Sequence, residues 1–200
     1  AAYVTRQEGR KFLRLETDLD TATIIPNQPG QREDLSLYIH IPFCRKLCPF
    51  CCFNRYLFDE QKARQYYRHL RLELEEYIRR GFSFSDFYFG GGTPTVLMDE
   101  LLSFIAFIKE KFQVKNLSLE TTPAEITPET IKLLEKAGVN RLSLGVQSFD
   151  DTNLQAMGRT QCSGREAYER IQLTRGHFNT VNIDLIFNFP FQTLESFQRD

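Results

Sequence analysis

The feature that most constrains the fold of this chain is a regular alternation of strand and helix patterns from residue 36 onward. Short apolar runs alternate with longer segments in which apolar residues recur at helical spacing. The expected strands span residues 36–41, 84–89, 116–120, 141–146 and 180–187. This alternation, with short connections, predicts a parallel sheet with right-handed crossovers and strands covered on both faces.

The segments between these strands carry the signals that begin and end helices. The expected helices span residues 59–80, 99–112, 127–138 and 163–175, with a further one near the end of the chain. Thr127 and Pro128 form a favoured helix start, and Gly138 is a favoured helix end. Ser163 and Glu166 form a capping box.

These units predict an α/β fold, a partial and open (β/α)6 TIM-like barrel of parallel strands. Five to six units are too few for a closed barrel of eight strands, and no Gly-x-Gly-x-x-Gly turn follows the first strand. Residues 1–35 are expected to form a strand or two and a linker, and residues 36–200 the core domain. The chain lacks a starting Met, and its last residues resemble the beginning of a helix. We therefore expect a piece of a longer protein.

Composition and charge exclude several classes of function. The chain has 25 Lys and Arg against 26 Asp and Glu, and a net charge of −1 offers no basic excess to hold a phosphate backbone. No apolar run approaches the roughly 18 residues of a membrane span. The amino terminus has no signal-peptide core. We therefore expect a cytoplasmic protein with no nucleic-acid partner and no membrane span.

Four of the five cysteines fall within nine residues, from Cys44 to Cys52. The spacing Cys44-x3-Cys48-x2-Cys51 follows the first expected strand. Three thiolates on one loop can hold three corners of a four-iron cluster and leave one iron open to a ligand. A structural zinc needs a fourth ligand downstream, and neither Cys162 nor a histidine has the spacing for it. The role of Cys52, as a fourth ligand or as a packing or reactive thiol, stays open.

This cysteine motif, with Phe50 before its last cysteine, resembles the signature of radical S-adenosylmethionine (SAM) enzymes. The preceding Tyr-Ile-His-Ile-Pro-Phe run is similar to one branch, the oxygen-independent coproporphyrinogen III oxidases and their relatives, which include heme chaperones. The similarity extends from residue 35 to residue 200, and its main stretches are residues 38–44, 89–95, 140–149 and 182–186. All four stretches occur in the order of that branch, so the chain is identified as a member of the superfamily.

The resemblance implies a [4Fe–4S] cluster held by Cys44, Cys48 and Cys51, with SAM bound at the open iron. In such enzymes an electron from the cluster cleaves SAM to methionine and a 5′-deoxyadenosyl radical, which abstracts hydrogen from the substrate. The cofactors supply the chemistry and the protein orients them, so no residue is assigned a catalytic role. The residues implied to bind SAM are Tyr38, Phe50, Gly91, Gly92, Thr93, Glu120, Gln147, Arg159 and Asp184.

Several of these positions have plainer interpretations that the residues alone leave open. The glycines of residues 90–92 let the backbone approach SAM closely, or they form a plain tight turn. Glu120 binds a cationic group or a ribose, or is a solvated loop charge. Arg159 clamps the SAM carboxylate, or forms an ion pair with Asp150 or Asp151. Asp184, in an apolar strand, contacts SAM or anchors a buried polar network.

The chain differs from the oxidase pattern at several positions, so the motifs do not decide which member of the branch it is. The oxidase reads Cys-Gly-Cys where this chain has Cys51-Cys52-Phe53, and its Arg-Tyr-Thr-Ser-Tyr-Pro stretch does not occur in residues 1–37. The leading hypothesis is a radical SAM oxidoreductase acting on a tetrapyrrole-like substrate. The alternatives are a heme-binding chaperone, a radical methyltransferase and a zinc-stabilised binding module. Arg45 and Lys46 are expected to dock a reduced flavodoxin or ferredoxin as electron donor.

Overall fold

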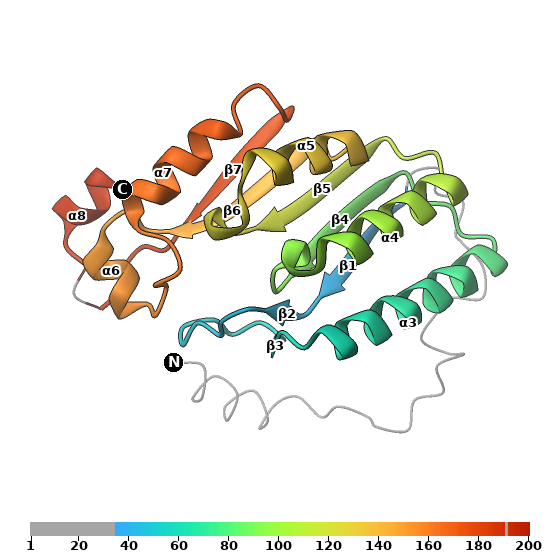
Figure 1. The fold of residues 1–200 in the computed structure, drawn as a ribbon, viewed down its shortest axis with the longest axis horizontal. Coiled ribbons are helices and arrows are strands. Elements are labelled where there is room, and N and C mark those ends of the chain that lie inside the picture. Colours follow the sequence, from blue (N-terminus) through green and yellow to red (C-terminus); the bar gives the residue numbers. More distant parts are fainter. Residues whose placement is uncertain (1–34, 191) are drawn as a thin grey trace.

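A five-stranded parallel sheet forms the centre of the computed structural model, which describes residues 35–190 and 192–200 (Figure 1). Its spatial order, β1-β4-β5-β6-β7, is also the order along the chain. The five strands are β1 (Ser36–Ile41), β4 (Asp86–Gly91), β5 (Asn116–Thr121), β6 (Arg141–Gln147) and β7 (Thr180–Leu185). Apart from residue 35, the strand and linker expected in residues 1–35 lie outside the described residues.

Helices fill the connections between these strands. A second, two-stranded parallel sheet pairs β2 (Phe43–Cys44) with β3 (Tyr56–Leu57). Two short 3-10 helices, η1 (Pro94–Leu97) and η2 (Pro123–Glu125), follow β4 and β5. The α-helices are α3 (Glu60–Arg79), α4 (Met98–Lys111), α5 (Pro128–Ala137), α6 (Asp151–Ala156), α7 (Gly164–Leu173) and α8 (Leu194–Arg199).

The strand order decides between the two architectures that the sequence analysis considered. In a doubly wound sheet the strand order reverses, and helices cover both faces. Here each crossover adds the next strand at the same edge, so right-handed connections place the connecting helices on one face. This is the winding of a barrel, and the predicted open α/β barrel is confirmed. The main sheet has five strands among the described residues, and the sixth strand of the predicted barrel is not among them.

The two faces of the sheet differ because successive strand residues point in opposite directions. The face under the helices is apolar, and its buried residues include Phe87, Phe89, Leu117, Leu119, Leu142 and Leu144. The residues between them, such as Tyr88 and Glu120, belong to the opposite face. Within the part of the chain that the structure describes, the expectation of strands covered on both faces is therefore wrong. With all crossovers on one side, polar side chains occupy the other.

Local capping signals predicted the helix ends well. The Thr127 hydroxyl accepts a hydrogen bond from the backbone N–H of Thr130 at 3.1 Å, and Pro128 is the first residue of α5. Gly138 ends that helix with a φ of 87°, in the left-handed region that favours glycine. The capping box of Ser163 and Glu166 is present at the start of α7.

Strand ends and very short elements were predicted less well. β2 and β3 have two residues each, too few to show a period, and α6 has six residues. β4 begins at Asp86 rather than at residue 84 and continues to Gly91. The Gly90–Gly92 segment is therefore mainly the end of a strand, and the alternative of a plain tight turn is wrong. β7 ends at Leu185, two residues earlier than expected.

β2 and β3 close the loop that carries the cysteines. The backbone N–H of Tyr56 donates to the carbonyl oxygen of Pro42 at 2.6 Å, and that of Phe58 donates to the carbonyl oxygen of Cys44 at 2.9 Å. These bonds join the two ends of the segment between β2 and β3. The cysteines consequently lie on a closed loop directly above the end of β1.

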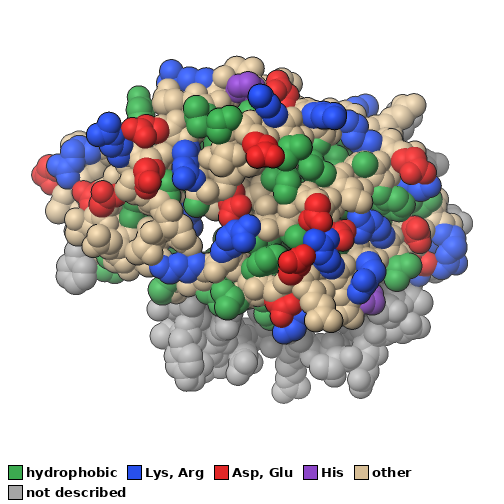
Figure 2. Space-filling view, viewed as in Figure 1, with side chains coloured by type: hydrophobic (Ala, Val, Ile, Leu, Met, Phe, Trp, Pro, Cys, Tyr) green, Lys and Arg blue, Asp and Glu red, His purple; other side chains and the backbone are tan. Residues whose placement is uncertain are grey.

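Charged side chains of both signs occupy the face of the molecule that Figure 2 shows. Figure 2 shows Lys and Arg side chains interspersed with Asp and Glu over the face in view, in keeping with the net charge of −1. In the part of the chain that the structure describes, no helix has both the length and the apolar character to cross a membrane.

Gly92→Ala is expected to lower the free energy of unfolding by about 3 kcal/mol. A Cβ atom at Gly92 would meet the backbone oxygen and nitrogen of Phe43 at 2.6 and 2.8 Å, and backbone atoms cannot rotate away. Gly81→Ala is the control, because a Cβ atom there would have no other atom within 4 Å. Only the backbone strain of an alanine at a φ of +83° opposes this substitution. That strain costs about 1 kcal/mol. Equal losses in chemical denaturation would contradict the close approach of β4 to Phe43.

Candidate functional site

A cavity of about 810 Å³ lies at the carboxyl ends of the strands, beneath the cysteine loop. Parallel strands bring their ends to one edge of the sheet, so residues far apart in sequence meet there. Eleven of the twelve residues singled out by the sequence line it, namely Cys44, Cys48, Phe50, Cys51, Gly91, Gly92, Thr93, Glu120, Gln147, Arg159 and Asp184. The exception is Tyr38.

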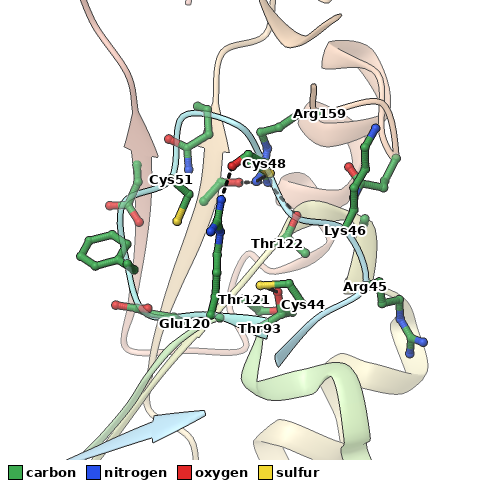
Figure 3. A pocket seen from close by; sticks show the side chains of 18 of the residues that line it. Cys44, Arg45, Lys46, Cys48, Cys51, Thr93, Glu120, Thr121, Thr122 and Arg159 are labelled. Atoms are coloured by element: carbon green, nitrogen blue, oxygen red, sulfur yellow. Dashed lines mark hydrogen bonds between the residues drawn. The ribbon is translucent and has the colours of Figure 1, made fainter. Parts of the chain in front are cut away.

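Cys44, Cys48 and Cys51 bring three free thiols to this cavity. Their sulfur atoms point into a common space from different sides (Figure 3). Cys48 is buried, and the other two are partly exposed. The backbone N–H of Cys51 donates to the carbonyl oxygen of Cys48 at 3.2 Å, which fixes the turn between them. The loop therefore presents the three thiols together.

The electrostatics of Cys44 reflect the two neighbouring thiols. Burial raises the pKa of the Cys44 thiol, and nearby Cys51 and Cys48 raise it further, because neighbouring thiolates repel one another. A hydrogen bond from the Thr93 hydroxyl to the Cys44 sulfur, at 3.7 Å, and the positive charge of Arg55 act in the opposite direction. Crowded thiolates of this kind are a suitable ligand set for a positively charged metal centre.

The arrangement of donors fits a cluster better than a single ion. Among residues 35–190 and 192–200, no three His, Cys, Asp or Glu side chains are arranged to hold one metal ion. In an iron–sulfur cube each thiolate binds a different iron, so cluster ligands need not converge as zinc ligands do. The zinc-stabilised module stays an alternative prediction. Cys52 is exposed at the cavity, and its role stays open.

Two cations fasten the cysteine loop to the barrel. Arg45 pairs with Glu125 of η2 at 2.9 Å and donates to the carbonyl oxygen of Val96 at 3.2 Å. Lys46 donates to the hydroxyl of Thr160 at 2.7 Å. Figure 3 shows the Arg45 side chain directed away from the sulfur atoms. Both cations have partners within the chain, and their docking of an electron donor stays a prediction.

Glu120, near the end of β5, is held in place by two donors. The Tyr88 hydroxyl donates to Oε1 at 2.6 Å, and the backbone N–H of Gly91 donates to Oε2 at 3.1 Å. Burial raises the pKa of Tyr88, and the hydrogen bond to Glu120 raises it further. The alternative of a freely solvated loop charge is therefore wrong, because the carboxylate is oriented at the cavity wall.

Gln147 ends β6 in an unusual backbone conformation. Its φ is 77°, in the left-handed region that few residues other than glycine adopt. The register between β6 and β7 shifts between Gly145 and Gln147, and such irregularities redirect side chains. The backbone N–H of Ile186 donates to the Gln147 carbonyl oxygen at 2.9 Å and secures this position. Backbone strain of this kind clusters at functional sites.

Arg159, which follows α6, reaches three acceptors at the cavity. Its guanidinium donates to the Thr122 hydroxyl at 2.9 Å, to the carbonyl oxygen of Gly145 and to the sulfur of Cys48 at 3.7 Å. The alternative of an ion pair with Asp150 or Asp151 is therefore wrong. The guanidinium instead lies among neutral acceptors and one thiol, within the cavity lining.

Asp184 lies on β7, the edge strand of the described sheet. It is exposed rather than buried, because no strand beyond β7 covers it among the described residues. Its carboxylate accepts hydrogen bonds from the Ser143 hydroxyl at 3.1 Å and the Asn182 amide at 2.8 Å. The expected burial is wrong, but the polar network exists and lies at the cavity.

Tyr38 lies beside the cavity rather than in its lining. Its ring stacks on Tyr88, with 5.9 Å between ring centroids, and its hydroxyl lies 2.9 Å from Nδ1 of His40. Nε2 of His40 lies 2.8 Å from the carbonyl oxygen of Asn54. A carbonyl only accepts, so Nε2 carries the proton and the Tyr38 hydroxyl donates to Nδ1. The proposed contact between Tyr38 and SAM stays a prediction.

Sequence reasoning missed other residues of the cavity lining. Thr121 and Thr122 lie at the end of β5, where the rule that ligands bind at carboxyl strand ends would have found them. Arg55 lies at the cavity four residues beyond the last cysteine of the motif, and Gln161 follows α6. No local pattern marks either of these two residues.

The open barrel and its thiol-lined cavity define a class of α/β proteins that hold a metal cluster at the carboxyl ends of parallel strands. The family model described as "Radical SAM superfamily" matches residues 38–200. The chain belongs to the radical SAM superfamily, as its motifs predicted. This membership implies a [4Fe–4S] cluster and SAM as cofactors.

Individual relatives fall into two groups. The chain is 38% identical to the oxygen-independent coproporphyrinogen III oxidase of Escherichia coli, over 98% of this chain and 43% of that protein. It is 34% identical to the heme chaperone HemW of Bacillus subtilis, over 80% of this chain and 44% of that protein. The solved structure of the E. coli oxidase, HemN, described as a radical SAM enzyme, matches with a TM-score of 0.75 and 36% identity. That match covers 83% of this chain and 40% of HemN. The chain thus spans less than half the length of these relatives.

Tyr88→Phe is expected to cost about 1 kcal/mol of unfolding free energy below pH 9, because the bond to Glu120 is lost. The pKa of Tyr88 is raised in the folded state, so above pH 10 the folded chain binds more protons than the unfolded chain. The contribution of Tyr88 therefore declines as pH rises above 10, and the two proteins converge. Denaturation between pH 7 and 11 measures this, with Tyr168→Phe on the exposed side of α7 as control. A difference in unfolding free energy between wild type and Tyr88→Phe that widens as pH rises would contradict the hydrogen bond from Tyr88 to Glu120.

Thiol alkylation tests which cysteines bind the cluster. After anaerobic reconstitution, iodoacetamide is expected to modify the exposed Cys52 and to leave Cys44, Cys48 and Cys51 unmodified, as measured by peptide mass spectrometry. Removal of iron by a chelator should then expose Cys44 and Cys51 to the reagent. Protection of Cys52 together with loss of protection at one of the other three would contradict the assigned ligand set.

Proposed function

We propose that this chain forms the core of a radical SAM oxidoreductase of the coproporphyrinogen III oxidase type. The observation that carries the proposal is that three free thiols and an oriented polar wall line one cavity. Cys44, Cys48 and Cys51 would hold a [4Fe–4S] cluster. When bound, the reduced cluster supplies the electron that cleaves SAM.

The protein's own contribution is to bind and orient SAM opposite the thiols. Glu120, fixed by Tyr88 and Gly91, offers a carboxylate to a cationic or hydroxyl group. Arg159 now contacts mainly neutral acceptors, and a ligand carboxylate would form stronger, charge-assisted bonds with its planar guanidinium. The further residues proposed to bind SAM are Tyr38, Phe50, Gly91, Gly92, Thr93, Gln147 and Asp184.

A tetrapyrrole-like substrate follows from the relatives. The alignment with the E. coli oxidase covers 98% of this chain and so extends into residues 1–34, whereas that with the B. subtilis heme chaperone covers 80%. The identity to this oxidase, 38% against 34% for the heme chaperone, supports the oxidase reaction over heme carriage. The Cys51-Cys52-Phe53 run, which departs from the Cys-Gly-Cys of the oxidases, keeps the heme chaperone as the second candidate.

The domain limits, location and electron donor are part of the same proposal. Residues 36–200 would form the core, and residues 1–35 an extension. All five cysteines are free, as in proteins of reducing compartments, which supports a cytoplasmic location. A reduced flavodoxin or ferredoxin would supply the electron.

Product analysis tests the proposal. Anaerobically reconstituted protein with dithionite and SAM is expected to form 5′-deoxyadenosine, whereas Cys44→Ala should form no more than a protein-free blank, because the cluster loses a ligand. Cys52→Ala is the matched control, a neighbouring cysteine whose loss should leave product formation intact. The absence of 5′-deoxyadenosine from wild-type protein with a full cluster would overturn the proposal.

The choice between the two candidates needs the substrate. Consumption of coproporphyrinogen III, dependent on SAM and measured by chromatography, is expected of an oxidase. Stoichiometric binding of heme without consumption of coproporphyrinogen III would instead select the chaperone.

A further inference from the structure

Arg55 directs a guanidinium from the end of the cysteine loop into the cavity. One of its terminal nitrogens, Nη2, donates to the carbonyl oxygen of Cys48, and the residue belongs to the cavity lining. Its Nε–H is buried and has no hydrogen-bond partner in the described part of the chain. An unpaired buried donor on a charged group is costly, because it has lost its hydrogen bonds to water without replacement. An unpaired donor of this kind favours an acceptor beside the guanidinium.

The surroundings of Arg55 indicate that this acceptor is anionic and lies among the thiols. The guanidinium is bonded to the backbone of Cys48, and its positive charge acts on the thiol of Cys44. Three thiolates give an oxidised [4Fe–4S] centre a net negative charge, and reduction by one electron adds another. A guanidinium held this close favours the more negative state.

The other cations of the cavity lining are engaged differently. Arg45 pairs with Glu125 on the outer side of the loop, and its side chain is 57% exposed. Lys46 is bonded to a threonine hydroxyl, and Arg159 has three acceptors. Of the four Lys and Arg residues that line the cavity in the described ranges, Arg55 is the one with a buried, unpartnered donor.

We propose that Arg55 is a positioning residue that raises the reduction potential of the cluster by placing a fixed positive charge and an unpaired Nε–H donor beside it. This inference rests on the proposed function. The step is a one-electron transfer from an external reductant to the cluster. No bond breaks, and the electron's charge is balanced in part by the guanidinium.

A redox titration tests this inference. Reconstituted protein without SAM is titrated anaerobically with dithionite, and the electron paramagnetic resonance signal of the reduced cluster is followed. Arg55→Gln removes the charge but keeps an amide donor, whereas Arg55→Lys keeps the charge. Arg45→Gln is the matched control, because it removes a cation of the same loop that is paired and directed outward.

Arg55→Gln is expected to lower the ratio of reduced to oxidised cluster about tenfold at a fixed potential, which is about 59 mV for one electron. Arg55→Lys and Arg45→Gln should stay near the wild-type potential. An unchanged potential in Arg55→Gln, or an equal shift in Arg45→Gln, would overturn the inference and leave the proposed function standing. Failure of the wild-type protein to bind a cluster would instead overturn the proposed function.

Loss of the cluster in the variants is also informative. If Arg55→Gln cannot hold a cluster but Arg55→Lys holds one at the wild-type potential, the requirement for charge is supported. If neither variant holds a cluster, Arg55 serves only to fasten the loop, and the electrostatic role is wrong. Far-ultraviolet circular dichroism of each variant confirms that the barrel is folded.

Discussion

The closure of the cysteine loop is the constraint on which the rest of this site depends. The loop has no helix, and the entropy of a free chain opposes any fixed arrangement of three thiols. Two backbone hydrogen bonds, from Tyr56 and Phe58, join its ends at β2 and β3. Arg45 and Lys46 then attach it to two separate segments of the barrel. These contacts convert a motif in the sequence into a shared cavity.

The winding of the sheet decides what that cavity contains. Because the crossovers all pass over one face, the apolar half of each strand is covered and the other half is free to carry polar groups. Tyr88, Glu120, Ser143 and Asp184 lie on that free side and bond to one another or to neighbouring residues. Satisfied polar groups of this kind are oriented without the cost of unpaired burial. The cavity wall is thus arranged before any ligand binds.

Most of the fold was predictable because its signals are local. Helical spacing and caps such as Thr127 and Gly138 act within a few residues, and so they predicted α5 and its ends. Eleven of the twelve expected site residues line one cavity because a parallel sheet brings its strand ends together. Tyr38 differs because it lies three residues before the end of β1 and stacks on Tyr88. The exposure of Asp184 was missed because it depends on which strand lies beside β7.

The sequence by itself determined the alternation of strands and helices, the helix caps and the spacing of three thiols, since each is written within one short segment. Only the tertiary structure decided the partners of the charged groups. Arg45 bonds to Glu125 across 80 residues of sequence, and Lys46 bonds to Thr160 across 114. Arg159 bonds to Thr122 rather than to Asp150 or Asp151. The Nε–H of Arg55 is left without a partner near the thiols. Long charged side chains select partners by distance in space, and those distances exist only after the sheet has assembled.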